Sequence, residues 1–215
     1  MFVEGTLRWQ VTEDCPWDLL MALALRDLAG LANVERPPIP RVFPPVARVM
    51  HPASGAHPLP RPTVQGHVST PDRAALAEQW RAWWEFSLQR ERRPIVSLVR
   101  PPHFEVFDRA IELQDLVTEH YEEAVAWTTE RHAEYAELSL LQHSRRAADI
   151  VDVVRDREHE LRRQAGYFRL DIYVLPLVEP GAWIVAPHTV VVSTSLREDS
   201  TAFRDWFTPV IAALV

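Results

Sequence analysis

Lysine is missing from the sequence altogether, so arginine supplies all of its strongly basic side chains. A Schiff-base lysine, a phosphate-loop lysine and regulation by lysine modification are therefore excluded for these 215 residues. Codon bias in a GC-rich bacterial genome is a sufficient reason for this absence, and selection against lysine is the alternative.

Cysteine is almost absent too, because Cys15 is the only one, and a single thiol cannot build an intrachain disulfide framework. No apolar run approaches the roughly 18 residues needed to cross a bilayer, and the longest extends from Leu19 to Leu25. The first residues lack the basic and apolar regions of a signal peptide. We therefore expect a cytoplasmic protein in a reducing compartment, with no membrane partner.

Positive charge is in deficit, since the net charge is −7. Contacts to phosphates need a basic surface, so nucleic acid is not expected as a partner. The sequence patterns of dinucleotide sites, phosphate loops, zinc proteases and redox Cys-x-x-Cys sites do not occur. We accordingly predict no cofactor, and whether the protein is an enzyme stays open.

Hydrophobic residues make up 47% of the chain, which is enough for a sizeable core, and the length fits one α+β domain over residues 1–215. Alternating apolar residues predict strands near Val3–Val11 and Phe168–Val174. A turn at Pro180-Gly181 separates the second strand from further strand residues at 183–185 and 189–194, between which Pro187 predicts a bend or a break. These segments predict a small antiparallel sheet, formed by the N-terminal strand and a C-terminal hairpin and packed with helices.

Helical periodicity dominates the rest of the chain, apart from an irregular proline-rich segment at 33–69. The first half of that segment is expected to be an extended arm packed on the domain. Residues 103–165 are helical in pattern, and one helix of roughly 60 residues would be about 90 Å long. A compact domain is only about 45 Å across, so we expect a break between 139 and 144 and a long antiparallel helical hairpin.

The expected helix starts follow from capping residues and proline. Asp14 or Cys15 is expected to cap a helix whose first residue is Pro16. Thr70 is expected to cap the helix that carries a tryptophan cluster, and Ser200 the last helix, which Pro209 should kink or restart.

Three histidines in the proline-rich segment, His51, His57 and His67, are weak candidates for metal ligands. Three imidazoles can hold an open Zn²⁺ site, but their spacing matches no structural zinc motif, and no carboxylate or thiol supports them. We therefore predict no bound metal. A hydrolase or metal-dependent enzyme that uses these histidines is the alternative function.

Two acidic stripes have the spacing seen in carboxylate metal bundles. Each stripe lies opposite the apolar face of its own helix, so we interpret both as solvated faces. A packing role is predicted for Cys15, and Ser193 to Ser195 near His188 lack the glycines of a nucleophile elbow. The stripes are formed by Glu112, Asp115, Glu119 and Glu122, and by Asp149, Asp152, Asp156 and His159.

Trp80, Trp83 and Trp84 cover a wide arc of their helix, so one of them is expected near the surface, where tryptophan favours partner binding. A broad core stripe is the alternative. No convergent set of acid, base and nucleophile appears in the sequence. The pattern therefore favours a non-catalytic bacterial cytosolic interaction or regulatory module, whose partner is another protein or a second copy of the chain.

Overall fold

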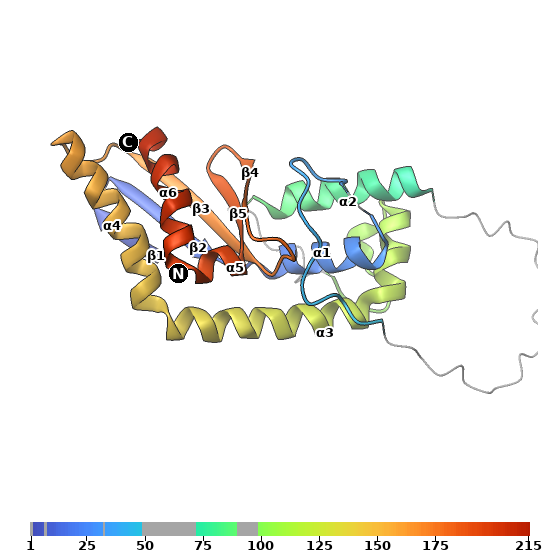
Figure 1. Ribbon diagram of the computed structural model, residues 1–215. Coiled ribbons are helices and arrows are strands. Elements are labelled where there is room, and N and C mark those ends of the chain that lie inside the picture. The colour runs from blue at the N-terminus through green and yellow to red at the C-terminus, as the bar shows by residue number, and fades with distance from the viewer. Residues whose placement is uncertain (1, 7, 32, 49–71, 90–98) are drawn as a thin grey trace, which may run out of the picture.

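The computed structural model describes residues 2–6, 8–31, 33–48, 72–89 and 99–215, and this part of the chain has an α+β fold. Its sheet contains five strands, and helices lie against both ends of it (Figure 1). The strands are β1 (Phe2–Thr6), β2 (Trp9–Asp14), β3 (Phe168–Leu175), β4 (Ala182–Ala186) and β5 (Thr189–Ser193). The helices are α1 (Trp17–Leu28), α2 (Arg73–Ser87), α3 (Ile111–Leu141), α4 (His143–Leu161), α5 (Thr194–Glu198) and α6 (Ser200–Leu214), with a 3₁₀ turn, η2 (Glu105–Phe107).

The sheet is mixed, with the order β1-β2-β3-β5-β4, and this corrects the expected antiparallel arrangement. The three inner strands are parallel, and only the edge strands β1 and β4 pair antiparallel with their neighbours. Parallel pairing needs a long crossover, and the helices α1 to α4 provide it between β2 and β3. The predicted N-terminal strand is in fact two strands. The expected hairpin around Pro180-Gly181 does not form, because β3 pairs in parallel with β5, and the antiparallel hairpin at the C-terminal end of the sheet consists of β4 and β5.

The second half of β3 is buried on both faces of the sheet. Ile172 and Val174 join the apolar cluster under α4 and α6, whereas Tyr173 and Leu175 join the cluster around α1. A strand covered on both sides consists of continuous apolar residues rather than alternating ones. The sheet therefore links two hydrophobic cores.

Helix α1 lies inside the second of these cores, and its apolar residues are buried around its whole circumference. It ends in a Schellman motif at Gly30, whose φ is +64°. The amide of Leu31 donates to the carbonyl of Arg26 over 2.9 Å, and the amide of Gly30 donates to that of Asp27 over 3.1 Å. Glycine tolerates the left-handed conformation that this motif requires, and the chain leaves α1 toward the proline-rich arm.

The predicted break in the long helical segment is confirmed, because α3 ends at Leu141 and α4 begins at His143. The expected antiparallel pairing of the two helices is not confirmed. Figure 1 shows that they meet at a sharp corner. α3 extends toward α1, while α4 covers the sheet beside α6.

The helix caps differ from the expected ones. Pro16 itself precedes α1 as the N-cap, without a side-chain hydrogen bond. Asp72 caps α2 through the amides of Ala74 and Ala75, while the expected Thr70 lies outside the described residues. Asp199, rather than Ser200, caps α6, and that helix continues through Pro209. In both helices a nearby aspartate, two residues after Thr70 and one residue before Ser200, satisfies the free amides of the first turn, and sequence alone does not separate the choices.

Candidate functional site

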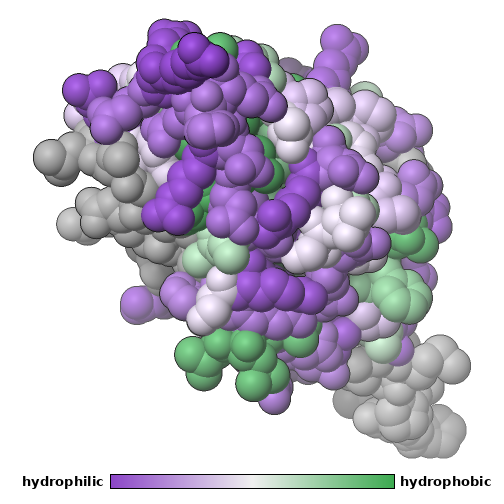
Figure 2. Space-filling view, turned by 60° about the vertical axis from the view of Figure 1, so that its left-hand side comes forward, coloured by the Kyte–Doolittle hydropathy of each residue, from purple (hydrophilic) through white to green (hydrophobic). Residues whose placement is uncertain are grey.

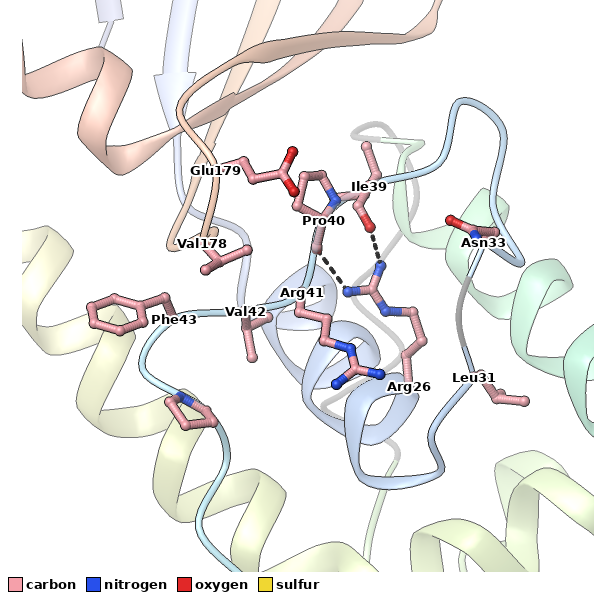
Figure 3. Close-up of a pocket in the computed structure, with 11 residues that line it drawn as sticks. Arg26, Leu31, Asn33, Ile39, Pro40, Arg41, Val42, Phe43, Val178 and Glu179 are labelled. Carbon is pink, nitrogen blue, oxygen red and sulfur yellow. Dashed lines mark hydrogen bonds between the residues drawn. The ribbon is translucent and has the colours of Figure 1, made fainter.

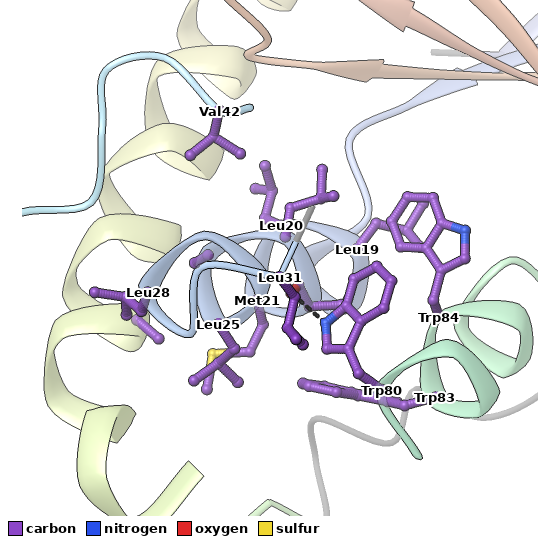
Figure 4. Close-up of a cluster of buried hydrophobic side chains, with 14 of the residues drawn as sticks. Leu19, Leu20, Met21, Leu25, Leu28, Leu31, Val42, Trp80, Trp83 and Trp84 are labelled. Carbon is purple, nitrogen blue, oxygen red and sulfur yellow. Dashed lines mark hydrogen bonds between the residues drawn. The ribbon is translucent and has the colours of Figure 1, made fainter. Parts of the chain in front are cut away.

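The three tryptophans of α2 are all buried, with exposed fractions of 0% for Trp80, 4% for Trp83 and 2% for Trp84. The indole N–H of Trp80 donates to the carbonyl of Ala22 over 2.7 Å, which fixes α2 on α1 (Figure 4). Trp83 lies edge-on to Phe107, with 5.3 Å between the ring centroids. The expectation that one tryptophan lies near the surface is therefore wrong, and the broad core stripe is confirmed, because Phe107 of η2 packs against Trp83 on the side that α1 leaves open.

The metal-site candidates have different outcomes. His51, His57 and His67 lie outside the described residues. Within the described ranges, no group of three or more His, Cys, Asp or Glu side chains is arranged to hold a metal ion.

Among the helices that the structure describes, none is both long and apolar enough to span a membrane.

Most of the first acidic stripe lies on the outside of α3 as predicted, with Asp115, Glu119 and Glu122 exposed, but Glu112 is half-buried and accepts a hydrogen bond from the side chain of Gln79. The second stripe does so only in part, because Asp156 and His159 are exposed but Asp149 is buried. Asp149 is only 2% exposed and accepts hydrogen bonds from three side chains on α5 and α6. The prediction fails at Asp149 because the arginines that face it come from helices about 50 positions further along the chain.

The nucleophile candidates have structural roles. Cys15 is buried, and burial together with the nearby Asp14 carboxylate raises the pKa of its thiol far above the ordinary value. This thiol stays protonated at neutral pH. Ser193 caps α5 by accepting from the amide of Leu196 over 3.2 Å, and it also accepts from the amide of Gly181 over 2.9 Å. His188 is exposed in the turn between β4 and β5.

A buried ionic network joins the end of β2 to α4, α5 and α6. Glu13 pairs with Arg146 over 2.8 Å and with Arg197 over 2.6 Å, and all three side chains are fully buried. Arg197 also pairs with Asp149 over 3.2 Å. Its guanidinium lies 4.0 Å from the centroid of the Phe203 ring. Two buried arginines are thus balanced by two buried carboxylates.

The partners of Asp149 determine its ionisation. Burial alone would raise the pKa of this carboxyl, but hydrogen bonds from Ser200, Arg204 and Arg197 outweigh that effect and lower it. Ser200 donates over 2.6 Å and Arg204 over 2.8 Å. Asp149 is therefore charged at neutral pH, and the network is a structural clamp between α4 and α6.

A second buried arginine network fixes the proline-rich arm, which is defined here as residues 33–48. Arg26, on the last turn of α1, is 1% exposed and pairs with the fully buried carboxylate of Glu35. The same guanidinium donates to the carbonyls of Ile39 over 2.9 Å and Pro40 over 2.8 Å (Figure 3). Asp27 accepts from the amide of Val42 over 2.8 Å. The side chains of Arg26 and Asp27 on helix α1 therefore hold the arm largely by its backbone carbonyl and amide groups.

The middle of the arm also pairs with the loop that follows β3. Val42 and Leu177 form an isolated antiparallel bridge. The amide of Phe43 donates to the carbonyl of Pro176, and the amide of Val178 donates to that of Arg41, both over 2.9 Å. The described half of the proline-rich segment is thus an extended arm packed on the domain, as predicted.

The arm and this loop border an open pocket of about 490 Å³, called the hollow below and drawn in Figure 3. Ile39 and Val42 contribute buried apolar surface to it, and Phe43 and Val178 stand at its edge with exposed fractions of 60% and 55%. Arg41 and Glu179 supply exposed charges on its walls. The arm surface, meaning the hollow with Arg41, Phe43 and Val178, is the main candidate for a binding site.

Other exposed apolar side chains are placed differently. Leu140 and Leu141 are 80% and 74% exposed at the corner between α3 and α4. The side of the molecule that carries α4 is largely hydrophilic, with a small hydrophobic group near the lower edge of the view in Figure 2. A pair of leucines on a projecting corner offers no concave surface, whereas the arm surface combines a hollow with charge and apolar side chains.

Comparison with known proteins adds no assignment, since no family model, no curated protein and no solved structure matches the chain.

We expect Arg197→Met to lower the free energy of unfolding by about 3–5 kcal/mol, because it leaves two buried carboxylates without their shared partner. Urea unfolding measures the change. Arg155→Met on the exposed side of α4 is the matched control and should stay within about 0.5 kcal/mol of the unchanged protein. Equal costs for the two variants would contradict a clamp role.

Asp149 should also make stability depend on acidity. Its pKa is lower in the folded state than in the unfolded chain, where an aspartate titrates near ~3.9. The contribution of Asp149 to the free energy of unfolding is therefore complete above that pH, and it is lost as the pH falls through the folded-state pKa. Urea midpoints measured from neutral to acid pH should fall less steeply in Asp149→Asn than in the unchanged protein. Parallel curves for the two proteins would refute this assignment.

Proposed function

We propose that this chain is a non-catalytic cytosolic interaction module that binds a protein partner through the arm surface. The observation that carries the proposal is the exposure of Phe43 and Val178 beside a hollow whose backbone is firmly held. Exposed aromatic and aliphatic side chains next to a concave surface are typical anchors for partners.

The rigidity of the arm supports this function. Val42 is hydrogen-bonded to α1, and the indole N–H of Trp127 on α3 donates to the carbonyl of Pro44 over 2.9 Å. Arg81 on α2 donates to the carbonyl of Val34 over 2.8 Å. A surface that is ordered before binding loses little conformational entropy when a partner docks.

We predict that replacing both Phe43 and Val178 by serine abolishes capture of the partner while the fold persists. The tagged protein would be used to retrieve its partner from native-host lysate, and far-UV circular dichroism would confirm folding. The matched control replaces Ile111 and Leu140, which are 62% and 80% exposed elsewhere, by serine. The proposal predicts that a specific protein is no longer captured by the Phe43 and Val178 variant but is still captured by the Ile111 and Leu140 variant.

Light scattering on the purified chain shows whether the partner is a second copy of this chain or a different protein. A dimer that becomes a monomer only in the Phe43 and Val178 variant would mean that the partner is a second copy. Identical captured proteins and identical mass in all variants would overturn the arm surface as a binding site.

A further inference from the structure

The sequence of the arm and its continuation differs in charge from the rest of the chain. No aspartate or glutamate occurs from Arg36 to Pro71, while this stretch contains Arg36, Arg41, Arg48 and Arg61. Helix α3 has the opposite charge, because it contains eight carboxylates and a single arginine. On a chain with a net charge of −7, the arm therefore carries net positive charge, and the exposed carboxylate of Glu179 is a negative charge on the wall of the hollow that the arm lines.

The structure leaves this positive charge available to a ligand. Glu35, the one carboxylate of the arm, is 1% exposed and is paired with Arg26. Arg36 and Arg41 are exposed, and neither has an ion pair or hydrogen-bond partner for its side chain among the residues that the structure describes. Glu179 lines the same hollow as Arg41, but its carboxylate forms no ion pair with Arg36 or Arg41.

Arg41 is also placed next to the apolar part of the same surface. It lines the hollow together with Phe43 and Val178, and its own carbonyl is bonded to the amide of Val178. A ligand that covers both features needs a carboxylate for the guanidinium and an apolar side chain for the hollow. Guanidinium–carboxylate pairs form charge-assisted hydrogen bonds that favour one orientation.

We propose that the arm surface binds an acidic, extended segment of a partner protein, in which carboxylates flank one large apolar residue. A carboxylate pairs with Arg41, and the apolar residue enters the hollow between Phe43 and Val178. This inference depends on the proposed function and adds the chemistry of the partner to it.

A protein segment fits the surface better than a nucleic acid does. Nucleic-acid binding relies on many arginine or lysine contacts with phosphates. Here the positive arm crosses the acidic helix α3 at Trp127, and the field of that helix repels a polyanion. A short segment with few carboxylates can reach Arg41 without approaching α3 along its length.

The test is fluorescence polarisation with labelled short peptides in which Asp and Glu flank a single Leu, Phe or Trp. Matched peptides carry Asn and Gln at the same positions. We predict that the acidic peptides bind, that the amide peptides bind at least about tenfold more weakly, and that added salt weakens the acidic ones. Arg41→Glu should reduce affinity at least about tenfold, whereas the control Arg155→Glu should leave it nearly unchanged.

Three outcomes would overturn the inference: equal affinity for acidic and amide peptides, no binding of any acidic peptide, or equal effects of Arg41→Glu and Arg155→Glu. A single-stranded oligonucleotide that binds more tightly than the peptides, in an Arg41-dependent manner, would also overturn it and identify a nucleic acid instead. Capture of a partner that needs Phe43 and Val178 but ignores Arg41→Glu would reject only the acidic segment and leave the proposed function standing.

Discussion

The buried guanidinium of Arg26 is the interaction on which the arm surface depends. An arginine in the last turn of a helix suits the negative end of the helix dipole, and here it also donates to one carboxylate oxygen of Glu35 and to the carbonyls of Ile39 and Pro40. Proline lacks an amide hydrogen and cannot join a sheet as a donor. A proline-rich chain therefore needs side chains such as Arg26 to hold it against a domain.

A similar buried arginine–carboxylate network lies on the other side of the sheet, where Arg146 and Arg197 pair with Glu13. Both networks are buried, and in each the arginines are matched by carboxylates. Removing one member of such a network is costly because a buried charge stays behind without a partner. The arm and the α4–α6 layer are thus fixed by ionic contacts as well as by hydrophobic packing.

Local patterns predicted the α+β class, the break before His143, the extended arm and the packing role of Cys15. They did not predict the parallel strands or the buried position of Asp149, because both depend on contacts between residues far apart in the sequence. The arm surface could be located only in part. Its prolines marked an irregular segment, but the hollow exists only where Val42 meets Leu177.

Hydrogen–deuterium exchange tests most directly whether the arm is a firmly docked surface rather than a loose connection. The amides of Val42 and Phe43 donate to Asp27 and Pro176 outside the arm, and the amide of Ile39 donates to Glu35, which is paired with Arg26. They should exchange far more slowly than in an unstructured peptide, and Arg26→Met should speed their exchange by more than about tenfold while β3 stays protected. Exchange of these arm amides at the rate of an unstructured peptide in the unchanged protein would contradict the account.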